Sequence, residues 1–335
     1  MTGSVDVADL IRQSREGRAR AVARLISLVE DASPVLREVS AEVAPLTGHA
    51  RVVGITGPPG VGKSTATSAV VRALRQQGNR VGVLAIDPSS PFTGGALLGD
   101  RIRMQDHALD TGVFIRSMAT RGRLGGVAWA TPPAIRVLDG VGFDVVLVET
   151  VGVGQSEVEI AGLADVTVVL LAPGMGDGVQ AAKAGILEIG DVFVVNKADR
   201  EGAQAAVRDL RQMISLGTPR EARAYEEPAR WRPPVLTTVA STGQGVDELL
   251  DTLERYQQWA EGSGELRGRR LRRAQREIET IAMTALRERM GDLTDGRRLD
   301  ELAAAVVDGR LDPYGAADEM LAALAASSRS SDPPA

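Results

Sequence analysis

A glycine-rich run, GPPGVGKS at residues 57–64, lies between a short apolar stretch and a helical pattern. It has the form G-x-x-x-x-G-K-S of a P-loop, in which backbone N–H groups surround the phosphates of a nucleotide. The apolar stretch 51–56 predicts a strand, and the pattern from about 63 to 77 predicts a helix, which is the context that this loop requires. The chain is therefore expected to fold as an α/β protein that binds a nucleoside triphosphate. Lys63 is expected to reach the β- and γ-phosphates, and the Ser64 hydroxyl is expected to bind Mg²⁺.

Short apolar runs alternate with helical stretches from residue 51 to about residue 260. The expected strands are 51–56, 80–87, 113–117, 143–150, 164–171, 191–197 and 235–240. The expected helices between them lie near 63–77, 126–140, 179–188, 201–216 and 245–259. Several runs, such as VTVVLL at 166–171, are apolar on both faces, which is typical of a mainly parallel sheet covered by helices on both sides.

Helical patterns flank this region on both sides. Residues 6–47 predict two packed helices with a break at 31–34, and the residues after 262 predict helices near 265–290, 297–308 and 312–325. We therefore expect four parts: an N-terminal helical extension at 1–48, a P-loop domain at 49–262, a C-terminal helical arm at 263–326 and a disordered tail at 327–335.

The first C-terminal helix leaves two questions open. Its apolar positions 271, 274, 278, 281 and 285 fit either a dimer interface or an ordinary amphipathic helix. A cluster of six arginines near its start, at 267, 269, 270, 272, 273 and 276, fits a solvated face better than an anion or nucleic-acid site.

Composition excludes several classes of protein. No apolar run reaches 18 residues, so a membrane span is not expected, and without cysteine there are no disulfides and no thiol chemistry. The net charge of −5 gives no support for general nucleic-acid binding, and a cytoplasmic location is the default. Only three of the 39 basic residues are lysines; two of them, Lys63 and Lys197, fall in nucleotide motifs. The third, Lys183, is either a functional residue or an ordinary surface lysine.

The tetrapeptide NKAD, residues 196–199, selects the base. It follows an apolar strand, at the edge where open α/β sheets bind ligands. A carboxylate at Asp199 can accept hydrogen bonds from guanine N1–H and its exocyclic amine, which adenine does not offer in that arrangement. Asn196 is expected to tie neighbouring loops together, the Lys197 stem to cover the base, and the segment 241–243 to close its other side with backbone groups. GTP is therefore the expected substrate, and weak ATP hydrolysis stays open as a side activity.

Acidic residues follow two strands on the other side of the P-loop. Asp87 ends the strand after the P-loop helix, where it can bind Mg²⁺ or its water ligands, while Asp100 fits a metal site and a turn about equally. Glu149 ends another strand and can reach Mg²⁺, and the N–H of Gly152 can contact the γ-phosphate.

The water-orienting glutamine that Ras-like GTPases carry directly after this glycine is missing, because Val153 stands there. Gln155 is displaced by two positions, and Arg116, Arg121 and Arg123 are loose candidates for charge stabilisation. Slow intrinsic hydrolysis that a partner accelerates is therefore expected. A further strand exit carries polar residues for which function and turn chemistry compete, namely Asp177, Gln180 and Lys183.

From about residue 30 to 320 the chain resembles the MeaB/ArgK family, the GTPases associated with methylmalonyl-CoA mutase. The stretches that carry the resemblance are Glu30-Asp31, GITGPPGVGKST (54–65), LAIDPSSPFTGGALLGDRIRM (84–104), FIRSMATRG (114–122), VETVGVGQSE (148–157), the loop 172–183 and NKAD. By matching position, the resemblance places the magnesium and switch sites at Ser64, Asp87, Asp100 and Glu149. It also places an extra switch, which in the family links nucleotide state to the mutase, at Asp177, Gln180 and Lys183.

The resemblance implies a homodimeric G-protein chaperone that loads adenosylcobalamin into the mutase and protects or repairs it, with the C-terminal helices as dimerisation arm. The residues expected to be catalytic are Lys63, Glu149, Asp87, Asp100, Gln180 and Lys183. Those expected to hold the nucleotide are Gly57, Pro58, Pro59, Gly60, Val61, Gly62, Lys63, Ser64, Thr65, Gly152, Asn196, Lys197, Asp199, Ser241, Thr242 and Gly243. Three alternatives remain: kinase-like phosphotransfer to a transport protein, a nucleotide-switched binding module with negligible turnover, and a metallochaperone GTPase. The shortage of His and Cys disfavours the last of these.

Overall fold

The computed structural model describes residues 5–87, 105–107, 109–119, 129–150, 159–174, 186–217, 230–294 and 297–330. Packing divides the chain into two compact units, residues 1–273 and residues 274–335. Each unit is described by itself.

A seven-stranded parallel sheet forms the centre of the first unit, with the strand order β3-β2-β4-β1-β5-β6-β7. The strands are β1 (Arg51–Thr56), β2 (Val81–Asp87), β3 (Val113–Ala119), β4 (Val145–Thr150), β5 (Val166–Leu171), β6 (Val192–Asn196) and β7 (Val235–Thr238). All seven expected strands are confirmed. β1 is central: the chain runs from it to one side through β2, β3 and β4, and to the other through β5, β6 and β7. Such a reversal of strand order is where open parallel sheets bind ligands.

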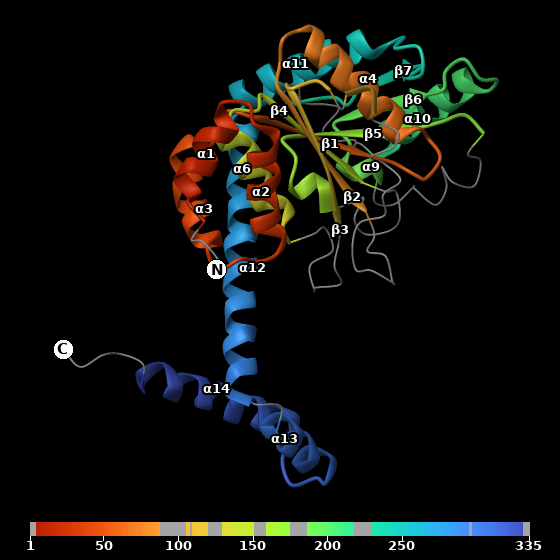
Figure 1. Cartoon of the computed structure of the whole chain (residues 1–335). Helices are drawn as coiled ribbons and strands as arrows, with labels where there is room; N and C mark the ends of the chain where they lie inside the picture. Colours follow the sequence, from red (N-terminus) through yellow and green to blue (C-terminus); the bar gives the residue numbers. More distant parts are fainter. Residues whose placement is uncertain are drawn as a thin grey trace. The chain divides into compact units, whose positions relative to one another are not determined.

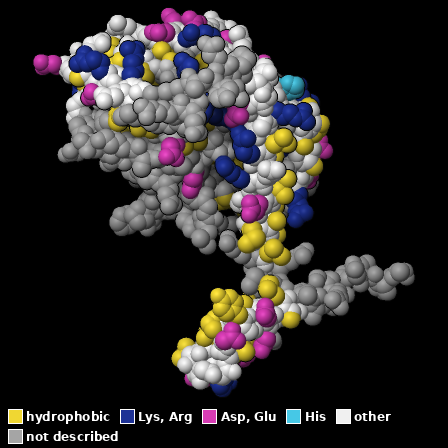
Figure 2. Space-filling model, turned by 180° about the vertical axis from the view of Figure 1, so that it is seen from behind, with side chains coloured by type: hydrophobic (Ala, Val, Ile, Leu, Met, Phe, Trp, Pro, Cys, Tyr) yellow, Lys and Arg dark blue, Asp and Glu magenta, His cyan; other side chains and the backbone are white. Residues whose placement is uncertain are grey.

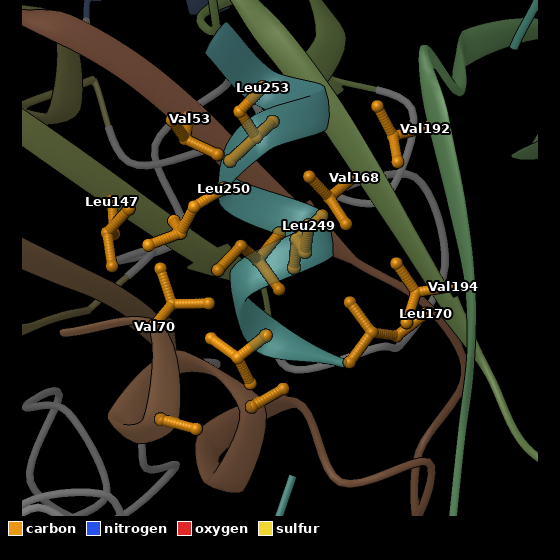
Figure 3. Close-up of a cluster of buried hydrophobic side chains, with 14 of the residues drawn as sticks. Val53, Val70, Leu147, Val168, Leu170, Val192, Val194, Leu249, Leu250 and Leu253 are labelled. Atoms are coloured by element: carbon orange, nitrogen blue, oxygen red, sulfur yellow. The ribbon is translucent and has the colours of Figure 1, made fainter. Parts of the chain in front are cut away.

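Helices cover both faces of this sheet (Figure 1). On one face α4 (Lys63–Gln76) and α11 (Val246–Gly262) pack together over the centre of the sheet. In Figure 3 Leu249, Leu250 and Leu253 of α11 lie among strand valines and leucines that point from this face. Burying each such side chain contributes about 1.5–3 kcal/mol, so this layer is a main source of stability.

The opposite face carries α6 (Thr131–Gly140), the N-terminal helices, η3 (Ile160–Gly162), α9 (Ile186–Ile189) and α10 (Ala203–Gly217). Neighbouring residues of a strand serve opposite layers. In β5, Val168 packs toward α11, whereas Val169 packs toward α10. This double burial explains why the strand sequences are apolar without alternation.

The N-terminal region holds three helices, so the expectation of two was wrong. They are α1 (Val7–Arg15), α2 (Ala19–Glu30) and α3 (Leu36–Val43), followed by a short 3₁₀ turn, η1 (Ala44–Leu46). The unexpected break lies at Gly17, whose φ is +89°. There the Gly17 N–H donates to Ser14 O and the Arg18 N–H to Gln13 O, the two bonds of a Schellman motif that ends α1.

Residue 265 begins α12 (Glu265–Thr294), which runs from the first unit into the second. The second unit continues with α13 (Arg297–Val307) and α14 (Pro313–Ser330). Asp312 caps α14 by accepting the N–H groups of Tyr314 and Gly315. α14 thus reaches four residues into the expected tail 327–335, and residues 331–335 lie outside the described part. Among the described residues, we find no helix with the length and apolarity that crossing a membrane requires.

Candidate functional site

The P-loop lies at the carboxyl end of β1 and leads directly into α4. Two of its glycines are required by close contacts. A Cβ at Gly57 would lie 2.1 Å from Leu170 O, and a Cβ at Gly62 would lie 2.7 Å from Asn196 Nδ2; both residues also have positive φ. Lys63 begins α4, and its buried ammonium donates to the carbonyl oxygens of Gly57 (2.6 Å) and Pro58 (3.0 Å). The Lys63 ammonium and the backbone of this glycine-rich loop therefore form a site that suits a phosphate group.

A hydroxyl and a carboxylate meet beside this loop. Ser64 Oγ donates to Glu149 Oε1 at 2.7 Å, and both side chains are buried. Glu149 is in register with Ile55 of β1 and points to the α4 face, and the neighbouring hydroxyls of Thr56 and Thr150 lie 3.0 Å apart. Hydroxyl and carboxylate oxygens are the hard donors that Mg²⁺ takes, so this pair fits the ion.

The other residues expected at the phosphate side are only partly described. Asp87 is the last residue of β2 and is in register with Ala119 of β3. Eight further candidates lie outside the described residues: Asp100, Arg121, Arg123, Gly152, Gln155, Asp177, Gln180 and Lys183.

Asn196 joins three segments of the site. Its Nδ2 donates to Val61 O in the P-loop at 2.9 Å. Its Oδ1 accepts from Thr238 Oγ1 and from the N–H of Ala240, both at 3.1 Å. Asn196 is buried, and these three bonds fix the P-loop and the segment after β7 to the end of β6. The sequence predicted that Asn196 connects neighbouring loops in this way.

Lys197 and Asp199 follow on the same turn. Lys197 has φ +57°, a left-handed conformation that is uncommon outside glycine, and its Nζ donates to Gly60 O at 2.6 Å. The Ala198 N–H donates to Thr238 O, which holds the turn against β7, and Asp199 is exposed. The Lys197 side chain therefore reaches from the base motif to the P-loop, while the Asp199 carboxylate is accessible.

The segment 239–245, which follows β7, is a tight turn and is the third segment of the site after the P-loop and residues 196–199. Val239 O accepts the N–H groups of both Thr242 and Gly243, and the Gln244 carbonyl accepts the N–H of Val239. Ser241 and Thr242 are exposed.

Arg116 points away from the phosphate side. Its guanidinium pairs with Glu30 and donates to Ser27 Oγ, both on α2. It therefore lies on the face of the sheet opposite α4, which argues against a role in charge stabilisation.

Three of the six clustered arginines hold the start of α12 against the amino edge of the sheet. Arg269 forms a two-pronged pair with Asp191, with both N···O distances 2.7 Å. Arg270 and Arg273 both reach Asp165, at 2.9 and 3.3 Å. Asp165 and Asp191 directly precede β5 and β6, and each also accepts a strand N–H, from Val52 and Thr167 respectively. Neither a solvated face nor an anion site describes these arginines, and the aspartate before each strand was the sequence signal that was missed.

This ion-paired cluster is partly buried, and burial affects its charges. Burial raises the pKa of Asp191 despite the opposing effect of the Arg269 guanidinium. Burial also raises the pKa of Tyr256, an effect that the nearby Asp191 charge strengthens.

The chain is similar to known GTPases over most of its length. The family model of the methylmalonyl-CoA mutase-associated GTPase MeaB matches residues 22–295. A protein of Pyrococcus abyssi is 49% identical over 315 residues, which are 94% of this chain and 96% of that protein. GTPase ArgK of Escherichia coli is 37% identical over 270 residues, or 79% of this chain and 80% of its own.

Two further matches are a mouse protein and a crystal structure. The mouse protein named methylmalonic aciduria type A homolog, mitochondrial, is 42% identical over 218 residues, which are 65% of this chain and 52% of the mouse protein. A crystal structure of a LAO/AO transport system kinase superposes with a TM-score of 0.69 at 27% identity and covers 96% of this chain and 98% of its own. With a family model over more than half of its length and relatives of high identity and coverage, this chain belongs to the MeaB family of P-loop GTPases, which are associated with methylmalonyl-CoA mutase.

Proposed function

We propose that the chain binds GTP at the carboxyl edge of the sheet and hydrolyses it slowly until a partner accelerates the reaction. The observation that carries this proposal is the bonding of Asn196, which joins the P-loop to the base motif and to the segment after β7. In this arrangement the residues 57–65 hold the phosphates, and Lys63 stabilises their charge. Asp199 reads guanine, Lys197 covers the base, and Ser241, Thr242 and Gly243 close the pocket.

Ser64 and Glu149 are the described residues that would hold Mg²⁺, together with Asp87 and Asp100 from the sequence. Bound Mg²⁺ neutralises charge on the β- and γ-phosphates. The Ser64–Glu149 contact of 2.7 Å supports this assignment because it brings two hard oxygen donors together next to Lys63. Gly152, Gln180 and Lys183 complete the proposed set as switch residues.

We propose that nucleotide state controls a client enzyme, an adenosylcobalamin-dependent acyl-CoA mutase. The family description names methylmalonyl-CoA mutase, and this supports a chaperone that gates cofactor loading and protects or repairs the mutase. The missing glutamine after Gly152 supports partner activation, since the chain by itself lacks the usual water-orienting residue.

We propose further that the helical arm, residues 263–326, forms a homodimer. Figure 2 shows hydrophobic side chains on the surface of the second unit. The exposed large hydrophobic residues of this unit include Ile278, Ile281, Met283, Leu286, Leu299, Val307, Tyr314 and Leu321, each at least 45% exposed. Apolar surface of this kind is stabilised when a second copy covers it.

The test is steady-state hydrolysis of GTP, with ATP as control, before and after addition of purified methylmalonyl-CoA mutase from the same organism. Slow GTP turnover that rises with mutase supports the proposal, and Lys183→Ala should then reduce the stimulation. If hydrolysis does not respond to mutase, the chain is a GTPase with another client. If stimulation by mutase is unchanged in Lys183→Ala, the extra switch is not part of the mechanism.

Phosphotransfer is a second candidate, because the solved relative with the similar fold is named a LAO/AO transport system kinase. Labelled γ-phosphate separates the two: hydrolysis releases it as free phosphate, whereas a kinase moves it to a protein. A metallochaperone role has less support, because the chain has no cysteine and its described residues contain no group of three or more His, Asp or Glu that could hold a metal.

A further inference from the structure

A stripe of polar side chains runs along α4 away from the P-loop. Four residues at helical spacing form it: Ser64, Ser68, Arg72 and Arg75. Each has a partner outside the helix, in the same order: Glu149, His107, Asp106 and Asp110. Three of the four partners come from one stretch, residues 106–110, so this stretch follows the helix for two turns.

His107 makes the buried contact of this stretch. Its Nε2 lies 3.0 Å from Ser68 Oγ and 3.2 Å from the carbonyl oxygen of the same residue. A carbonyl oxygen only accepts, so Nε2 carries the proton and donates toward Ser68. The imidazole is 7% exposed and Ser68 is 8% exposed, whereas the other histidine, His49, is exposed. A buried donor of this kind costs free energy if its acceptor is removed, so the contact holds the stretch against α4.

The two neighbouring ion pairs hold residue 107 against α4 less well than its own contact with Ser68 does. Arg72 and Asp106 approach only to 3.6 Å, and both side chains are mostly exposed, a geometry in which an ion pair contributes little. Arg75 and Asp110 form a two-pronged pair with N···O distances of 2.8 and 2.9 Å, but this pair lies at the entrance to β3. Of Asp106, His107 and Asp110, His107 is therefore the residue that contacts α4 nearest to Ser64.

The place of this contact on α4 gives it a consequence for the reaction. Ser68 lies one helical turn from Ser64, which the proposed function assigns to Mg²⁺. We propose that His107 is a positioning residue: its contact with Ser68 fixes the first turns of the helix that carries Ser64. This inference rests on the proposed GTPase function, and it assigns to that site a residue that does not itself touch nucleotide or metal.

Two variants at one position separate the hydrogen bond from packing. His107→Phe keeps a ring of similar volume and removes the donor, while His107→Gln keeps an N–H near the position of Nε2. Two quantities are measured: the affinity for fluorescently labelled GDP over a Mg²⁺ titration, with EDTA as the metal-free point, and the Mg²⁺ concentration that half-saturates single-turnover GTP hydrolysis.

For His107→Phe we expect the half-saturating Mg²⁺ concentration to rise about three- to tenfold, the range that one lost hydrogen bond allows, while GDP affinity in EDTA changes less than about twofold. His107→Gln should recover most of the loss. Arg72→Ala is the matched control, since it removes the exposed neighbouring contact and should leave the Mg²⁺ dependence as in the wild type.

Two results would overturn the inference. One is a His107→Phe protein that melts at a lower temperature but keeps the wild-type Mg²⁺ dependence in both measurements, which would make the contact structural only. The other is a loss that His107→Gln does not recover. Failure of the proposed function is visible separately, in a wild-type protein that does not hydrolyse GTP. The Mg²⁺ titration of GDP affinity still decides the role of His107 in that case.

Discussion

Asn196 combines a donor and an acceptor function at a buried position, and no shorter or purely apolar side chain can replace both. Asn196→Ala removes the bond to Val61 O and leaves the Ala240 N–H and the Thr238 hydroxyl without their acceptor. We expect the free energy of unfolding to fall by about 2 kcal/mol or more, since each buried group that loses its partner costs roughly 1–3 kcal/mol. Urea unfolding in the absence of nucleotide measures this. Asn196→Asp, which keeps the acceptor, should be intermediate, and a loss below about 0.5 kcal/mol for Asn196→Ala would contradict the joining role.

Asp199 differs because it is exposed and its proposed role concerns the ligand alone. Asp199→Asn should leave the free energy of unfolding without nucleotide within about 0.5 kcal/mol of the wild type. It should weaken guanine nucleotide binding by several kcal/mol, because the amide offers a donor where guanine also offers donors. Calorimetric titration with GDP and ADP measures the effect. Retained preference for GDP in this variant would remove Asp199 from base recognition.

Asn196 and Arg116 differ in how well their side-chain contacts could be predicted from the sequence. The bonding of Asn196 could be predicted because its motif has one fixed place at the end of a strand. Arg116 could not be placed, because its partner Glu30 is distant in sequence and lies on α2. A strand that is buried on both faces gives no alternation from which its orientation could be deduced.

At the scale of elements, the start of α12 depends on the aspartates that precede β5 and β6. Arg269→Ala would leave the largely buried Asp191 without its charged partner, although the Thr167 N–H remains. We expect a loss of about 3 kcal/mol in the free energy of unfolding, the low end for breaking a buried pair. Arg272→Ala is the control, since Arg272 is 54% exposed on the same helix and should cost less than about 0.5 kcal/mol. Equal losses for the two variants in urea unfolding would refute the assignment.

We expect the link between α4 and the turn before β3 to depend on pH. Hydrogen bonds from the Arg75 guanidinium, with help from the Gly112 N–H, hold the pKa of Asp110 below its ordinary value of 3.8. Because the pKa is lower in the folded state, the contribution to stability is complete above the unfolded pKa and is lost as the pH falls through the folded pKa. The difference in unfolding free energy between wild type and Asp110→Asn should therefore be constant above about pH 5 and shrink below pH 4. Asp251→Asn, at an exposed site on α11, is the control; a difference for Asp110→Asn that does not change between pH 6 and pH 3 would contradict the expectation.

The strands could be predicted from the sequence because a parallel sheet buried on both faces needs continuous apolar runs, and polar, glycine or proline residues lie near the ends of the runs here. The N-terminal helices were harder. The break at Asp31-Ala32-Ser33-Pro34 contains a proline, whereas the break at Gly17 depends on one glycine within a charged stretch. A glycine of this kind fits a helix interior and a helix end alike until the bonds to Ser14 and Gln13 are known.

At the scale of the whole molecule, the nucleotide motifs indicated the function of the first unit, whereas the role of the second unit had to be inferred without a motif. The motifs have fixed positions relative to the sheet, because the phosphates and the base must meet the ends of particular strands. The second unit has no such requirement. Its helices were predicted from their periodicity, but their exposed apolar side chains do not by themselves name what covers them.

The proposal that a second copy covers this unit can be tested on α12. Ile278 is 66% exposed and Ile281 is 57% exposed, and they lie three residues apart on one side of the helix. Replacing both by Glu places two charges where a dimer would bury apolar surface, at a cost of several kcal/mol. Sedimentation equilibrium should then give a monomer for the double variant and a dimer for the wild type, with GDP affinity unchanged because the nucleotide residues lie in the first unit. Glu279→Arg is the control for altered charge on the same helix and should remain dimeric. A dimer that survives the double substitution would remove this face from the interface, and a wild-type monomer would remove the arm as a dimerisation element.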